Sequence, residues 1–124
     1  MLELRPDPAE LARMRDFIRR RAAHHGLDEA DTFQAQLVAT EAVTNAMRHG
    51  ITADGKSISV TCVWREDGLT IEVGDRGRFR QREASTPDAT SGRGLGLIER
   101  LTRQFDLETS DSGTKLRMLV GGVL

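Results

Sequence analysis

The sequence has a single cysteine, no apolar run long enough to cross a bilayer, and almost no surplus of charge of either sign. Because Cys62 has no second cysteine to pair with, an internal disulfide is excluded, which fits a reducing cytoplasm. The residues after Met1 show no signal-peptide pattern, so we expect a cytoplasmic protein without a membrane span. The net charge of -1 gives no general attraction to nucleic acid or to acidic lipid.

The length and composition are those of one globular domain. With 124 residues, of which 38% are hydrophobic and 30% charged, the chain has room for one core. It contains no internal repeat and no low-complexity tract. We therefore expect a single domain over residues 1–124.

The first half predicts two helices. Asp7-Pro8-Ala9-Glu10 is typical of a helix start, with Asp7 as the cap and Glu10 closing a capping box, and Gly26 predicts the end. A second helix is predicted from a cap at Asp28 to Gly50, and its expected buried side is formed by Phe33, Leu37, Val38, Ala42 and Val43. Five arginines of the first helix indicate either a solvated basic face or a protein-docking surface: Arg13, Arg15, Arg19, Arg20 and Arg21.

The second half alternates as strands do. Residues 58–64 and 69–73 predict two strands joined by a hairpin turn at Glu66-Asp67-Gly68, with Cys62 and Trp64 on the buried face of the first. A helix through Ile98, Leu101 and Phe105 and strands over 105–109 and 116–120 follow. This order predicts an α+β fold, a two-layer α/β sandwich whose mixed, mostly antiparallel sheet has helices on one face.

Glu41 and Asn45 lie four residues apart, so a helix places both on one face, with Arg48 and His49 near the same strip. A carboxylate there can act as a general base for a hydroxyl, and an amide oxygen can bind magnesium when phosphates supply other ligands. Solvated helix residues with no further role are the alternative.

Two more clusters follow along the chain. Asp75-Arg76-Gly77 ends a strand, where the carboxylate can accept a hydrogen bond from an exocyclic amine and Gly77 admits a flat ring; an ordinary turn is the alternative. The glycines of the run 92–97 open a helix, whose backbone amides attract phosphate. A dinucleotide-binding fingerprint is disfavoured because no strand precedes the run and no βαβ pattern follows it.

Taken together, these motifs resemble the GHKL (HATPase_c) superfamily of ATP-binding domains. The similarity is greatest to the small anti-sigma-factor serine/threonine kinases of bacteria, of the RsbW, SpoIIAB and RsbT type. Thr40–Gly50 looks like their N box, Asp75-Arg76-Gly77 like the first glycine box, and Gly92–Ile98 like the second. Gly113-Thr114 also matches, so the resemblance covers nearly the whole chain in order.

The resemblance implies a role for each matching residue. Glu41 is the expected general base, Asn45 the magnesium ligand, and Asp75 the residue that reads the adenine amine, with Gly77 beside the ring. Thr114 is expected to support the adenine pocket, and Arg48 and His49 match the N box. The expected phosphate-binding run comprises Gly92, Arg93, Gly94, Leu95, Gly96 and Leu97.

The implied cofactors are ATP and Mg2+. The implied function is a protein serine/threonine kinase and anti-sigma factor, which phosphorylates a STAS-domain anti-anti-sigma protein and regulates a sigma factor by partner switching. Two alternatives stay open: a switch kinase that acts on a STAS scaffold without sigma binding, and a non-catalytic ATP-dependent binding module. Neither a nucleic acid nor a membrane is an expected partner, and a homodimer is left open.

Overall fold

The fold, seen in a computed structural model, is described for residues 1–49, 58–65, 68–75, 96, 98, 100–110 and 113–120. The helical elements are η1 (Pro8–Glu10), α1 (Leu11–His24) and α2 (Glu29–His49). The strands are β1 (Leu2–Leu4), β2 (Ile58–Arg65), β3 (Gly68–Asp75), β4 (Gln104–Ser110) and β5 (Gly113–Val120). A further helical stretch contains Gly96, Ile98, Arg100 and Leu101. No helix within these ranges is long and apolar enough to cross a membrane.

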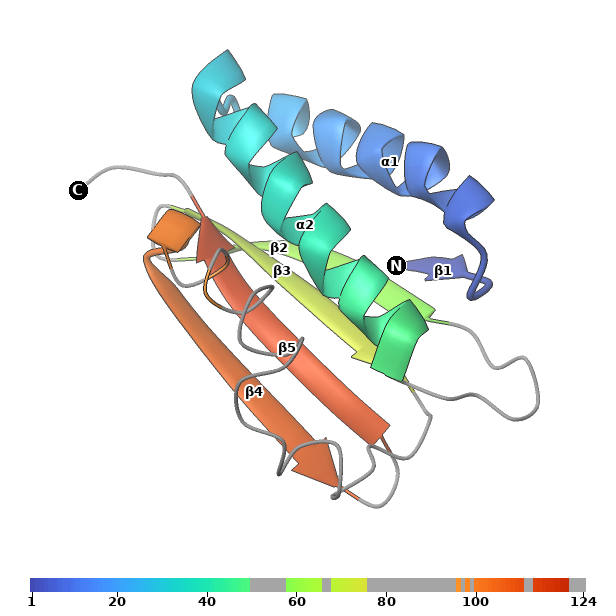
Figure 1. The fold of residues 1–124 in the computed structure, drawn as a ribbon. Helices are drawn as coiled ribbons and strands as arrows, with labels where there is room; N and C mark the ends of the chain where they lie inside the picture. The colour runs from blue at the N-terminus through green and yellow to red at the C-terminus, as the bar shows by residue number, and fades with distance from the viewer. Residues whose placement is uncertain are drawn as a thin grey trace.

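The strands form one sheet in the order β1-β2-β3-β5-β4, and each described pair of neighbours is antiparallel. Both α1 and α2 lie over the same face of this sheet (Figure 1). The predicted α+β sandwich with helices on one face is therefore confirmed. The predicted strands over 58–64, 69–73, 105–109 and 116–120 correspond to β2, β3, β4 and β5.

The core lies between the helices and the sheet. From α1 it takes Met14, Ile18 and Ala22, all fully buried, at the spacing of one helical face. Alternate residues of the strands face these helix side chains from the sheet. They include Val60, Ile71 and Met118, which are also fully buried. Along most of β2 and β3, residues that are buried in the core alternate with more exposed ones.

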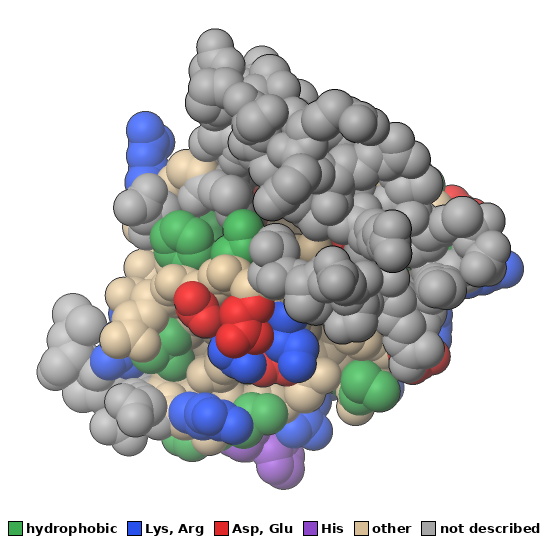
Figure 2. Space-filling model, turned by 90° about the horizontal axis from the view of Figure 1, so that it is seen from below, with side chains coloured by type: hydrophobic (Ala, Val, Ile, Leu, Met, Phe, Trp, Pro, Cys, Tyr) green, Lys and Arg blue, Asp and Glu red, His purple; other side chains and the backbone are tan. Residues whose placement is uncertain are grey.

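The face of the sheet away from the helices is polar. Arg117 at its centre pairs through Nε with Glu72 Oε2 at 2.7 Å, and its other nitrogens lie 3.4 Å from Asp106 and 3.6 Å from Glu108. Figure 2 shows acidic and basic side chains gathered on this side of the molecule. The hydrogen bond that Arg117 donates to Glu72, together with the nearby carboxylates, raises the pKa of the Arg117 guanidinium above its usual value.

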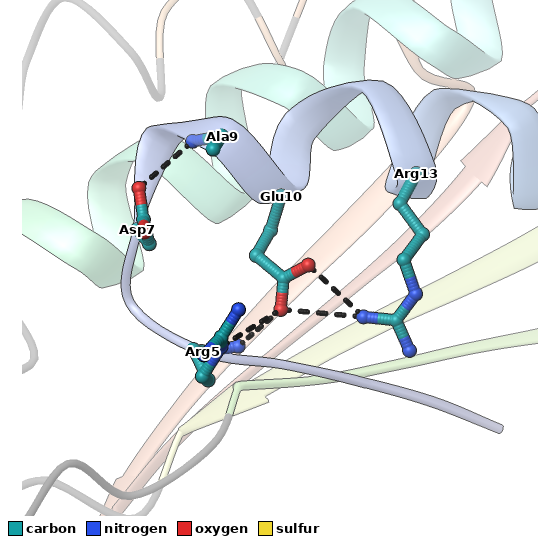
Figure 3. A network of polar contacts seen from close by, with 5 residues as sticks. All are labelled: Arg5, Asp7, Ala9, Glu10 and Arg13. Carbon is teal, nitrogen blue, oxygen red and sulfur yellow. Dashed lines mark hydrogen bonds and ion pairs between the residues drawn. The ribbon is translucent and has the colours of Figure 1, made fainter.

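The start of the first helical segment differs from the prediction in one contact. Asp7 caps it as expected, accepting a 3.0 Å hydrogen bond from the backbone N–H of Ala9. Glu10 does not complete the capping box: its carboxylate accepts from the backbone N–H of Arg5 at 3.0 Å and from Arg13 at 3.1 Å (Figure 3). The chain before the helix turns back, so the backbone N–H of Arg5 donates to the Glu10 carboxylate in place of the N–H of the cap residue Asp7.

In α2, Asp28 caps the helix as predicted, accepting from the N–H of Asp31 at 2.8 Å. The predicted burial of Phe33 is wrong, because its side chain is 63% exposed. Val38, Ala42 and Val43 are buried as expected, while Leu37 is half-buried. Phe33 lies in the first turns of the helix, before the stretch whose Val38 and Val43 pack into the core.

Two details of the strands also differ from expectation. Trp64 is not buried with the rest of its strand face but is 37% exposed, close to the end of β2. Phe105 lies in β4 opposite Met118 rather than in the preceding helix, since Arg103 already donates its backbone N–H to Leu119 O and begins the pairing.

Candidate functional site

The candidate site is built where the second half of α2 meets the end of β3. α2 packs on β3 and β5, and its last turns lie beside the end of β3 in Figure 1. The antiparallel register places Asp75, the last residue of β3, directly opposite Thr114 near the start of β5. Three segments that are distant in sequence therefore converge at one end of the sheet.

Asp75 is the buried charged residue of the described chain, with 9% of its surface exposed. It follows Gly74 on the central strand β3, between β2 and β5. Gly74 has close neighbours, because a Cβ there would lie 3.2 Å from Ser59 Oγ. A buried carboxylate at the end of a strand, opposite the hydroxyl-bearing Thr114, is a candidate site residue rather than part of an open turn.

Glu41 and Asn45 are both half-buried on α2. Their helix neighbours Ala42, Val43 and Ala46 are buried in the core. The two polar residues thus lie at the boundary between core and solvent. Arg48 is exposed one turn further on, and the helix ends at His49, whose side chain lies outside the described part of the chain.

Gly96 is helical, as the glycine run predicted for the start of a helix. Ile98 of the same stretch is fully buried, and its carbonyl accepts a 2.7 Å hydrogen bond from Thr102 Oγ1. Among the described residues, no atom lies within 4 Å of a Cβ built on Gly96, and the backbone there is not in the left-handed region. Glycine costs a helix up to about 1 kcal/mol relative to alanine, and neither packing against the described residues nor a left-handed backbone accounts for it.

The other members of the two glycine boxes lie outside the described residues: Gly77, Gly92, Arg93, Gly94, Leu95 and Leu97. The structure thus brings together Asp75 and Thr114 by register, and places Glu41 and Asn45 on the helix that packs beside them. Gly50, which was predicted to end α2, also lies outside.

Two leucines beside the Asp75–Thr114 pair were not singled out from the sequence. Leu116 and Leu107 face each other in the next row on the helix side of the sheet, two residues along β5 and β4. Leu116 is buried, whereas Leu107 is 40% exposed. Leu107 lies on β4, on the far side of β5 from Asp75, and alternation alone cannot reveal the leucine pair before the strand register is known.

Other chemistry is disfavoured in the described part of the chain. Burial raises the pKa of the Cys62 thiol to about 11, so it stays protonated near neutral pH and serves the core, as predicted. The described residues contain no cluster of three or more His, Cys, Asp and Glu side chains that could hold a metal ion. A cation at this site would need ligands from a bound molecule as well as from Asn45.

The family can now be stated. Residues 4–120 match the HATPase_c_2 family, described as the histidine kinase-like ATPase domain. This chain therefore belongs to that family, which makes it an ATP-binding domain of the kinase and ATPase type. The resemblance to the GHKL superfamily drawn from the three motifs is confirmed.

Solved structures share the fold. The RsbU and RsbW domains of Rv1364c from Mycobacterium tuberculosis align over 97% of this chain with a TM-score of 0.71 and 20% identity. Acinetobacter baumannii histidine kinase AdeS aligns over 98% of the chain with a TM-score of 0.56 and 11% identity. The chain spans only 32% of the first protein and 66% of the second. Among curated proteins, none matches this chain.

Proposed function

We propose that this protein is an ATP- and Mg2+-dependent serine/threonine kinase that phosphorylates a STAS-domain anti-anti-sigma protein. By switching between that protein and a sigma factor, it regulates transcription as an anti-sigma factor. The observation that carries the proposal is the pairing of buried Asp75 with Thr114 at the end of the sheet, beside the helix that carries Glu41 and Asn45.

The pairing supports an adenine pocket. The Asp75 carboxylate accepts a hydrogen bond from the exocyclic amine, and Thr114 supports the same end of the ring. Leu107 and Leu116 offer an apolar surface one row away. Because Asp75 is buried, an acceptor on the ring at that position would leave two acceptors opposed, which disfavours guanine.

The glycine run supports phosphate binding. Gly92, Gly94 and Gly96 hold the phosphates through backbone amides at a helix start, with Arg93 as a charge partner. Leu95 and Leu97 belong to the same segment. No described residue lies within 4 Å of the place where a Cβ of Gly96 would be, which supports close approach by a ligand.

Asn45 would hold magnesium through its side-chain oxygen, together with phosphate and water oxygens, and the ion would supply charge neutralisation for the phosphates. Glu41 would take the proton from the incoming serine or threonine hydroxyl as that oxygen forms its bond to the γ-phosphorus, while the bond from the γ-phosphorus to the β–γ bridging oxygen breaks and ADP leaves. Arg48 and His49 lie at the end of the same helix and complete the N box.

Helix α1 supports the protein partner. Arg19 and Arg20 share one carboxylate, that of Asp16, and Arg13 pairs with Glu10. Arg15 is exposed and has no ion pair among the described residues. This excess of positive charge on an exposed helix suits an acidic protein surface. An RsbW domain is also named in one of the solved structures that share the fold.

Two alternatives differ from this proposal in a measurable way: a switch kinase that binds no sigma factor, and a nucleotide-dependent binding module without transfer. The test is a pull-down from the native cell with the unmodified chain, in ATP with magnesium and in ADP, followed by mass spectrometry. Recovery of a STAS protein phosphorylated on serine or threonine, together with a sigma factor, is the expected result.

The other results separate the alternatives. A phosphorylated STAS protein without a sigma factor supports the switch kinase. A bound but unmodified STAS protein in the presence of ATP and magnesium supports the binding module and contradicts the kinase.

A further inference from the structure

The end of α1 is held by a compact set of backbone hydrogen bonds. Leu27 N–H donates to Ala22 O at 3.0 Å and Gly26 N–H to Ala23 O at 3.1 Å. Gly26 has a positive φ of 78°, so the three residues form a Schellman motif in which His25 is the C-cap. This motif fixes the backbone of His25 and therefore the direction in which its ring leaves the helix.

The ring of His25 reaches across to the sheet. It stacks on Trp64 of β2 with a centroid distance of 5.1 Å and an interplanar angle of 16°. His24 meets the same ring edge-on at 5.0 Å. One residue thus joins the end of α1 to the end of β2, and Trp64 is the single tryptophan of the chain.

The surroundings of the ring favour its neutral form. His25 Nε2 is shielded from solvent and has no hydrogen-bond partner among the residues that the structure describes. A neutral imidazole places only a lone pair there when its proton is on Nδ1, but an imidazolium places an N–H with no acceptor. Desolvation first, then His24 and Arg21, lowers the pKa of His25.

The charged and titratable groups that face His25 from α1 and β2 either favour its neutral form or are themselves uncharged. On α1, the guanidinium of Arg21 extends toward the sheet, with Nη2 3.4 Å from Cys62 O. On β2, the thiol of Cys62 is un-ionised because burial raises its pKa to about 11, and Arg65 is the charged residue of the strand. No carboxylate contributes to the lowered pKa of His25.

We propose that the His25–Trp64 stack is a pH-sensitive latch that fastens the end of α1 to β2 and opens when the imidazole takes up a proton. Two attractions oppose opening: the helix C-terminus favours a positive charge, and an imidazolium over an indole gains a cation–π contact. The shielded Nε2 and the cation of Arg21 outweigh them in this geometry.

The sign of the pH effect follows from the lowered pKa. Above about pH 6.5 the histidine is neutral in folded and unfolded chains, and the latch contributes fully. As the pH falls below that value, the unfolded chain takes up the proton first, and stability is lost until the pH reaches the folded pKa. Each unit of pKa difference raises the unfolding equilibrium constant by up to about tenfold.

The direct test is a proton NMR titration of the histidine rings from pH 8 to pH 5, with signals assigned by His24→Gln and His25→Gln variants. We expect a His25 pKa below 6.5 that moves toward 6.5 in Trp64→Leu. The fluorescence of Trp64 should change with the same midpoint in the unmutated protein and not in His25→Gln. A His25 pKa at or above 6.5 in the unmutated protein overturns the proposal without requiring any variant to fold.

A second measurement uses urea unfolding at pH 7.5 and pH 5.5. For the unmutated protein, the urea concentration at the midpoint of unfolding should be lower at pH 5.5 than at pH 7.5. This fall should be smaller in His25→Gln. His24→Gln is the matched control, because it removes a neighbouring imidazole that does not stack on Trp64, and it should keep most of the fall. Equal falls in His25→Gln and the unmutated protein would contradict the latch.

Discussion

Replacement of Asp75 by asparagine should abolish the preference for adenine over guanine nucleotides. Asp75 is only 9% exposed, so a guanine carbonyl placed opposite its carboxylate sets two buried acceptors against each other where adenine offers a donor. Such a mismatch costs about 1–3 kcal/mol, which corresponds to about ten- to a hundredfold in affinity. The asparagine amide presents an N–H to guanine or an oxygen to adenine, so the ratio of ATP to GTP affinity should fall close to one.

Calorimetric titration of one variant with ATP and with GTP gives the ratio of the two affinities. A loss of affinity that affects both nucleotides equally does not change this ratio. Glu72→Gln is the matched control: it makes the same chemical change three residues earlier in β3, on the face away from the helices, where Glu72 pairs with Arg117. It should leave the ratio unchanged. GTP binding as tight as ATP binding in the unmutated protein, or an unaltered ratio in Asp75→Asn, would refute the role of Asp75.

Three shorter predictions concern the metal, the phosphates and the thiol. Asn45→Ala should weaken binding of Mg-ATP far more than binding of metal-free ATP, and equal losses in calorimetry would remove the metal role. Gly96→Ala should raise the free energy of unfolding by up to about 1 kcal/mol, because the methyl group meets no atom of a described residue within 4 Å, yet it should weaken ATP binding; unchanged affinity would contradict the phosphate role. Cys62 should resist alkylation at pH 8 in the folded protein, where about one thiol in a thousand is ionised, and react only on unfolding.

The helices and strands with strong periodicity were predictable from the sequence, and their caps at Asp7 and Asp28 were too. β1 was missed because three residues are too few to show alternation; it exists because Leu2–Leu4 pairs with Ile58–Val60 of β2. Phe33 was wrongly placed in the core, since helical spacing shows which residues share a face but not how far along the helix the core extends.

The site residues could be predicted as motifs, but their positions relative to one another could not. Asp75 and Thr114 were proposed on separate grounds, and only the register of β3 with β5 sets them opposite each other. Leu107 escaped notice for the same reason, because its place opposite Leu116, in the row next to Thr114, depends on β4 pairing with β5. The stack of His25 on Trp64 likewise needs the relative position of α1 and β2.

The central claim is that this fold transfers a phosphoryl group and does not only bind nucleotide. The most direct measurement is single-turnover transfer of labelled γ-phosphate to the STAS partner by Glu41→Ala, beside a titration of ATP binding. Because Glu41 is assigned no phosphate or adenine contact, ATP affinity should stay within a few-fold, while transfer falls by about 100- to 10,000-fold. Glu29→Ala, at the exposed start of the same helix, should change neither. Transfer by Glu41→Ala at the unmutated rate would contradict the account.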